Sequence, residues 1–205
     1  MLTENLVTNK IMNKKTLLIV LLLLNNILNA QIIRSMTTYN SQNLKAGDYY
    51  KDVDGLLNKF TGTWKYISGN EEFVVKILKV NGYNFAGSND YSEDILFGGY
   101  KYVKNNATII DKLNFTYNNL NDYQNFAPFM GGSGQFSNNF QSISLLGDDL
   151  VVGKWLYIDL EVIPNTNPVQ MRWKTSPREN IRLNNTLPSQ GAGNGIPKDI
   201  ILIKQ

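Results

Sequence analysis

Asp159 and Glu161 are the side-chain pair whose types and spacing best suggest a reaction. They alternate with aliphatic residues, as in a β-strand, so both point to one face with origins roughly 6–7 Å apart. Two carboxylates at such a separation can serve as acid and nucleophile in a glycosidase. Acidic residues are also common on the outer face of a strand. A carboxylate-based hydrolase that uses this pair is therefore a minor alternative.

Composition removes most other catalytic chemistries. The chain contains no His and no Cys, which excludes Ser-His-Asp and Cys-His mechanisms and zinc sites built from His or Cys. Asp52, Asp54 and the pair Asp148-Asp149 lack EF-hand spacing, and turn formation explains them. The segment from Gly131 to Gly134 follows no clear strand and precedes no clear helix, so a phosphate loop is not expected. The sequence predicts a non-enzymatic protein with no metal and no cofactor.

The N-terminal segment has the three parts of a signal peptide. Residues 12–15 are basic, residues 16–24 are almost purely aliphatic, and residues 25–30 turn polar and end in Ala30. The apolar core is shorter than the roughly 20 residues that a membrane span needs. We expect translation to start at Met12 and cleavage to follow Ala30. This predicts a periplasmic or secreted protein that is not lipid-anchored.

The charge of the expected mature chain is close to balanced. Removing residues 1–30 leaves 17 basic and 16 acidic residues. No basic stripe remains, so a nucleic-acid partner is not expected. The expected partners are a small hydrophobic ligand or an envelope protein, and the chain is expected to be a monomer.

The elements that must position any site are short strands. Residues 31–52 show no sustained periodicity and are predicted to form an extended N-terminal arm, and residues 53–60 a short helical turn. After this, polar and apolar residues alternate with a period of two. Strands are predicted at 63–68, 73–77, 83–86, 95–103, 108–113, 115–117 (weak), 141–146, in both arms of a hairpin within 154–174, and at 200–203.

Turn signals separate these strands. Asn81-Gly82 is predicted to be a hairpin turn, Gly98-Gly99 to mark a bulge or bend, and residues 114–139 to be mostly loop. About eight to nine strands in one domain, residues 53–205, favour an all-β fold, either a sandwich or a closed antiparallel barrel. The last strand should pair with residues 63–68, because a closed barrel has no open edge.

The alternation also selects candidate site residues. An inward apolar stripe is predicted to line a cavity for a small apolar or amphipathic ligand; it consists of Phe73, Val75, Ile77, Phe85, Val169, Met171 and Trp173. Trp155 and Tyr157 share the opposite strand face from Leu156 and Ile158. If the core is instead filled, these two exposed rings are a candidate surface for an envelope protein or a polymer.

Several phrases of the chain are similar to those of a known family. They are residues 29–31, 51–53, 60–64, 161–164, 170–174 and 196–205. With them the chain resembles the uncharacterised exported lipocalin-like proteins (a domain of unknown function) of flavobacteria and their relatives, from the signal to the last residue. Some of these relatives carry a lipoprotein Cys where this chain has Asn29-Ala30. The family has no activity to carry over.

The resemblance implies that the fold is a single lipocalin-like (calycin-type) antiparallel barrel, with a structural plug at one end. Gly62 and Trp64 match the Gly-x-Trp at the head of the first strand of such barrels. There the Trp ring closes the barrel and a cation from the last strand lies across it. Lys204 is the residue of this chain that fits that role.

Overall fold

The computed structural model describes residues 31–85, 90–118, 125–137, 140–178 and 195–205. The predicted signal peptide lies outside these residues. The chain divides into two units, residues 1–32 and residues 33–205, and the fold is that of the second unit. In the described part of the chain, no helix is long and apolar enough to cross a lipid bilayer.

The described residues form strands joined by turns and by short 3₁₀-helices. The strands are β1 (Ile32–Ser35), β2 (Asp48–Lys51), β3 (Gly62–Ser68), β4 (Glu71–Phe85), β5 (Tyr91–Lys104), β6 (Ala107–Asp111), β7 (Phe129–Gly131), β8 (Ser142–Asp149), β9 (Lys154–Ile163), β10 (Gln170–Pro177) and β11 (Asp199–Lys204). The 3₁₀-helices are η1 (Met36–Thr38), η2 (Asn58–Phe60) and η3 (Ser133–Gln135).

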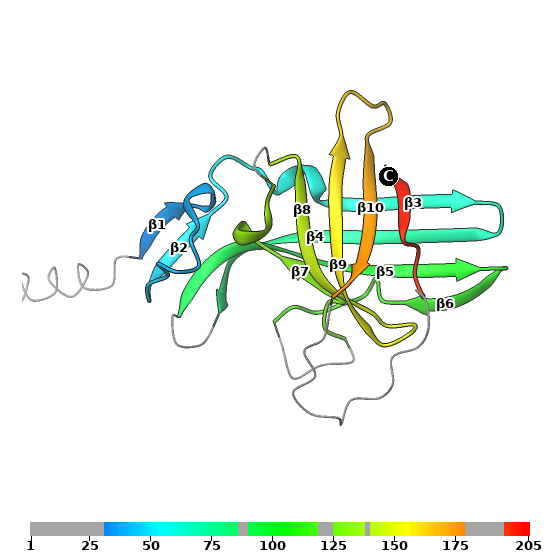
Figure 1. Cartoon of the computed structure of the whole chain (residues 1–205), viewed down its shortest axis with the longest axis horizontal. Coiled ribbons are helices and arrows are strands. Elements are labelled where there is room, and N and C mark those ends of the chain that lie inside the picture. The colour runs from blue at the N-terminus through cyan, green and yellow to red at the C-terminus, as the bar shows by residue number, and fades with distance from the viewer. Residues whose placement is uncertain (1–30, 86–89, 119–124, 138–139, 179–194) are drawn as a thin grey trace, which may run out of the picture. The chain divides into compact units, whose positions relative to one another are not determined.

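Eight of the described strands close into an antiparallel barrel. Their order is β5-β4-β3-β11-β10-β9-β8-β7, and β7 pairs back onto β5. The strands from β3 to β5 cross those from β8 to β10 in projection, as Figure 1 shows. The predicted all-β, lipocalin-like barrel is confirmed, and η2 supplies the predicted helical turn before β3.

The predicted closure by the last strand is also confirmed. β11 pairs antiparallel with β3, with Lys204 opposite Trp64, and on its other edge with β10. Both neighbours would otherwise carry an open edge of unpaired backbone groups.

The barrel closes on its other side through a strand that the sequence did not reveal. β7 has three residues and lies inside the segment predicted to be mostly loop. Three residues between Pro128 and Gly132 are too few to show a period of two. β7 nevertheless bridges β5 and β8.

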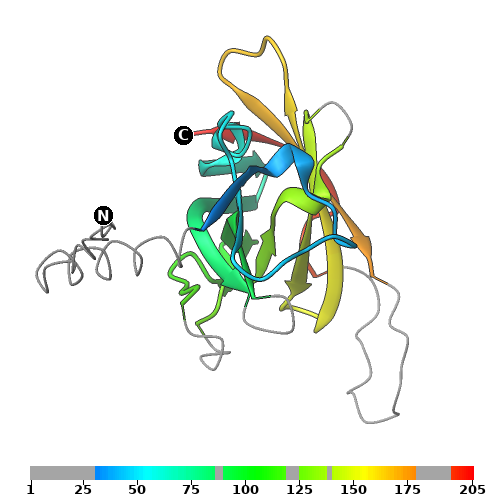
Figure 2. The same ribbon diagram turned by 90° about the vertical axis from the view of Figure 1, so that its left-hand side faces the viewer.

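The long strand β5 holds three partners along one edge. β2 pairs parallel with its first residues, Ser92 and Glu93. β7 pairs with its middle, and β6 pairs with its end. Residues 31–52, predicted to be an extended arm, thus contain two strands and η1, and β2 joins the sheet. Figure 2 views the molecule from the side on which β1 and β2 lie.

Two glycine signals have a different role from the one predicted. Asn81-Gly82 is not a hairpin turn, because β4 continues through it with a register shift between Val80 and Tyr83. Gly82 has φ +60°, which favours glycine and fits a bulge. Gly98 and Gly99 keep regular register with β4. A Cβ on Gly98 would lie 2.1 Å from Phe129 Cζ, so close packing requires glycine there, and no bulge interrupts the pairing with β4.

Candidate functional site

Five of the residues predicted to line a ligand cavity form the barrel core. Phe73, Val75 and Ile77 on β4, with Met171 and Trp173 on β10, are fully buried. The Phe73 ring centroid lies 5.2 Å from that of Trp173, and Phe129 on β7 packs on the same Trp173 ring at 5.7 Å. Because these contacts join separate walls of the barrel, this part of its interior is filled by protein side chains.

The other two predicted cavity residues lie elsewhere. Val169 has the same alternation as Met171 and Trp173, but it precedes the start of β10 and is exposed. Phe85, at the end of β4, belongs to a second apolar cluster with Ile95 and Met130.

The predicted plug residues meet at one point. Trp64 is fully buried, and its Nε1 donates a hydrogen bond of 2.9 Å to the carbonyl oxygen of Phe60. Lys204 Nζ lies 5.1 Å from the centroid of the Trp64 ring. A Cβ on Gly62 would lie 3.2 Å from Lys204 Cε, so glycine leaves room for the lysine to cross the ring.

The outer face of β9 carries the exposed aromatic pair. Trp155 is 48% and Tyr157 40% exposed, and the Arg178 guanidinium lies 5.7 Å from the Trp155 ring centroid. Asp159 and Glu161 share this face, because the alternate residues Leu156, Ile158 and Leu160 are buried. Both carboxylates thus lie on the outer face of β9 and point away from the barrel core.

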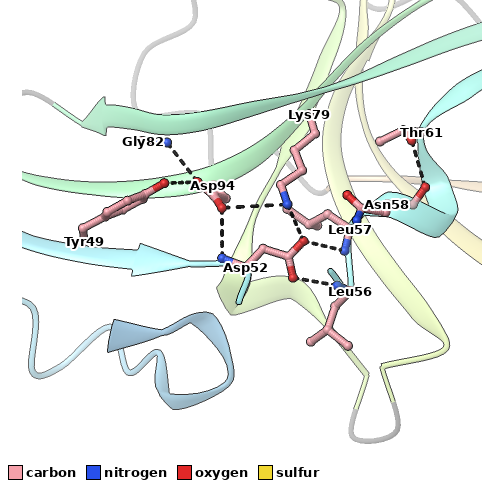
Figure 3. A network of polar contacts seen from close by, with 9 residues as sticks. All are labelled: Tyr49, Asp52, Leu56, Leu57, Asn58, Thr61, Lys79, Gly82 and Asp94. Carbon is pink, nitrogen blue, oxygen red and sulfur yellow. Dashed lines mark hydrogen bonds and ion pairs between the residues drawn. The ribbon is translucent and has the colours of Figure 1, made fainter. Parts of the chain in front are cut away.

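A polar network that the sequence did not reveal lies where β2, β4 and β5 meet (Figure 3). Lys79 Nζ on β4 lies 2.7 Å from Asp52 Oδ2 and 3.9 Å from Asp94 Oδ2. The side chains of Asp52 and Asp94 are 0% and 2% exposed, so one ammonium serves two buried carboxylates.

Backbone and hydroxyl donors complete the network. The Asp52 carboxylate accepts hydrogen bonds from the backbone N–H groups of Leu56 and Leu57. The Asp94 carboxylate accepts them from the backbone N–H groups of Asp52 and Gly82. The Tyr49 hydroxyl also donates to Asp94, at 2.5 Å. Burial and the hydrogen bond to Asp94 raise the pKa of Tyr49 to about 12, so this donor keeps its proton. The network fixes β2 and the turn before β3 against the barrel.

An aromatic pocket lies beside this network, at the start of β5. Its volume is about 400 Å³, and side chains from the segment after η1, from β4, β5, β7, η3 and β8 line it. The lining residues are Tyr39, Ser41, Phe85, Tyr91, Glu93, Ile95, Met130, Gly131, Gly132, Gly134, Gln135 and Leu146.

Three rings form one part of this lining. Phe85 and Tyr91 stack with centroids 5.2 Å apart, and the Tyr39 ring lies 6.3 Å from that of Tyr91. Burial raises the pKa of Tyr91, as does its hydrogen bond with Tyr39. The two tyrosines place hydroxyl groups near apolar surface, which suits an amphipathic molecule.

The glycine-rich segment holds a buried carboxylate against the pocket. Glu93 is 5% exposed, and its Oε2 accepts hydrogen bonds from the backbone N–H and the hydroxyl of Ser133. A Cβ on Gly132 would lie 2.4 Å from Glu93 Oε1, so glycine permits this close approach. The segment from Gly131 to Gly134 thus cradles a carboxylate of the protein itself.

Glu93 and Asp94 are consecutive, so they serve opposite faces of β5. Asp94 joins the network with Lys79, whereas Glu93 reaches the pocket. Burial is the largest influence on Glu93 and raises the pKa of its carboxyl group. The hydrogen bonds from Ser133 lower this pKa, and the negative charge of Asp94 raises it.

Replacing Glu93 by Gln is expected to stabilise the protein at neutral pH. A carboxyl group with a higher pKa in the folded state binds its proton more tightly there. Burial of Glu93 therefore costs no stability when the pH is below the ordinary pKa of 4.5, because the group is then protonated in both states. The cost grows as the pH rises from 4.5 toward the raised pKa, and it is constant above that pKa. Glu93→Gln should melt higher than the wild type at about pH 7.5, and the gap should close near pH 4.

The exposed Glu161 provides the control for this comparison. Glu161→Gln should leave the melting temperature unchanged at both pH values, since a solvated carboxylate loses little on substitution. A lower melting temperature of Glu93→Gln at neutral pH would contradict the assigned burial cost.

Comparison with known proteins adds one match. The model of a protein family, described as a family of unknown function (DUF6705), matches residues 12–205. Neither a curated protein nor a solved structure matches the chain.

Proposed function

The chain belongs to the family of unknown function DUF6705. We propose that this member is a non-enzymatic barrel protein that binds a small amphipathic molecule in the aromatic pocket. The observation that carries this proposal is the pocket itself, in which three rings and the apolar side chains of Ile95, Met130 and Leu146 surround about 400 Å³. This volume lies toward the lower end of the roughly 300–1,000 Å³ typical of ligand pockets. It suits a molecule with one or two rings.

The proposal includes export. Residues 12–30 have the composition of a signal peptide. The chain has no Cys and forms no disulfide, so its own core must stabilise it after export. In the periplasm or the medium, such a protein would carry or sequester its ligand as a monomer.

Tyr91→Ala is expected to weaken binding of a neutral hydrophobic dye such as Nile red by about tenfold, since one stacked ring is worth roughly 1–1.5 kcal/mol. Equilibrium fluorescence titration of the purified protein measures this change. Tyr157→Ala is the matched control, because it removes an exposed tyrosine ring from β9. If both variants bind the dye as the wild type does, or if the wild type binds none, the pocket is not the ligand site.

A second candidate function is contact with an envelope protein or a polymer through Trp155 and Tyr157. The large exposed fractions of these two rings favour it. Recovery of one reproducible partner from envelope extract by the wild type, and its loss with Trp155→Ala and Tyr157→Ala combined, would support this function. Equal recovery by both would reject the surface.

A further inference from the structure

The aromatic pocket has an uneven charge. Among the described residues that line it, Glu93 alone has a carboxyl group, and none is Lys or Arg. Some other acidic residues of the described chain have a cation of the protein close by, as Asp52 has Lys79 and Asp199 has Arg172. No cation of the described residues lies within ion-pair distance of Glu93. The pocket therefore contains a buried carboxyl group with no cation of the described residues beside it.

The hydrogen bonds of Glu93 leave one carboxylate oxygen available. Both bonds from Ser133 reach Oε2, and neither uses Oε1. Ser133 thus fixes the orientation of the carboxylate but does not neutralise it. Oε1 lies against Gly132, and a donor that reaches it would not have to displace Ser133.

The rings beside Glu93 add a second attraction for positive charge. The faces of aromatic rings are electronegative, and a cation near Tyr or Phe is stabilised there, more strongly when it is desolvated. Tyr39, Phe85 and Tyr91 line the same hollow as Glu93. Rings and a carboxylate together match an ammonium group attached to an apolar body.

We propose that the ligand of the aromatic pocket is an amphipathic amine, whose ammonium group pairs with Glu93 and whose apolar part contacts Phe85, Tyr91 and Met130. This inference rests on the proposed binding function and names its ligand class. The ammonium group supplies the counter-ion that the protein lacks at this position. An anionic molecule of the same size is rejected by Glu93.

Three ligands that differ chiefly in charge test this assignment: 2-phenylethylammonium, 2-phenylethanol and 3-phenylpropionate. Their affinities for the purified protein are measured by displacement of Nile red at about pH 7.5. The cation should bind at least about tenfold more tightly than the alcohol, and the anion most weakly. In Glu93→Gln, which keeps an acceptor for Ser133, the cation should lose its advantage over the alcohol.

The pH dependence of the wild type gives a second measurement that needs no variant. The titratable groups around Glu93 are Tyr50 of β2, Tyr83 of β4, Tyr91 and Asp94 of β5, and Tyr39. Burial raises the pKa of Tyr50, Tyr83 and Tyr91, and Asp94 faces the network with Lys79. Affinity for the cation should therefore fall as acid protonates Glu93, while affinity for the alcohol stays constant.

The outcomes separate the two proposals. The amine assignment is overturned if the dye binds but all three ligands displace it with equal affinity, or if the cation preference survives in Glu93→Gln. Either result leaves the proposed binding function standing. Absence of binding by the dye and by all three ligands overturns both. A cation preference that is lost both in Glu93→Gln and in acid supports both.

Discussion

Deletion of residues 199–205 is expected to abolish cooperative folding. β11 lies between β3 and β10 and pairs with both. Its removal exposes the edges of two barrel strands and takes away the buried Leu202, the half-buried Ile200 and the Lys204 contact with Trp64. Each buried aliphatic side chain contributes roughly 1.5–3 kcal/mol, and a ladder of hydrogen bonds is lost as well. The whole stability of a domain is typically about 5–15 kcal/mol.

Circular dichroism during heating measures this effect. The truncated protein should show no cooperative transition. Ile201→Thr and Ile203→Thr are the controls, because both side chains are partly exposed on the outer face of β11, and each should change stability by no more than about 1 kcal/mol. A truncated protein that melts cooperatively near the full-length temperature would contradict the closed barrel.

Lys79→Met is expected to destabilise the protein by about 3–5 kcal/mol, the usual cost of removing one partner from a buried ion pair. The substitution keeps the length and apolar stem of the side chain. It leaves Asp52 and Asp94 buried with no cation within the ion-pair distances that Lys79 provides. Because these carboxylates also bind the backbone of the turn before β3, the loss should loosen the N-terminal segment and β2.

Chemical denaturation measures the change in the free energy of unfolding. Lys65→Met is the matched control, since Lys65 pairs with Glu72 at 2.7 Å in a partly solvated position. Exposed pairs contribute only about 0–1 kcal/mol. Equal effects of the two substitutions would show that the network of Lys79 carries no special stability.

The strands with a clear period of two were predictable from the sequence. The hairpin of β9 and β10 and the pairing of β11 with β3 follow from alternating aliphatic residues and from the need to close a sheet edge. The join through β7 was not predictable, because three residues carry no period. Asn81-Gly82 was misinterpreted because the same dipeptide suits a hairpin turn and a bulge, and pairing with β5 decides between them.

The candidate site was less accessible to sequence reasoning than the fold. Phe85 was selected for the wrong reason, since it lines a pocket outside the filled core. Glu93 was missed because acidic residues in strands are usually solvated. The sequence feature that could have indicated a buried Glu93 is the acidic pair Glu93-Asp94 directly before an apolar run. The second feature is the distant Gly-Gly-Ser-Gly segment, whose Ser133 donates hydrogen bonds to Glu93. Contact between those two segments exists only in the folded chain.

The central claim is that the ligand binds in the aromatic pocket and not inside the barrel. Amide chemical-shift changes on titrating isotope-labelled protein with 2-phenylethylammonium test this most directly. We predict saturable changes centred on Tyr39, Tyr91, Glu93 and Gly132. Changes centred on Phe73, Met171 and Trp173, or no saturable change anywhere, would contradict the claim.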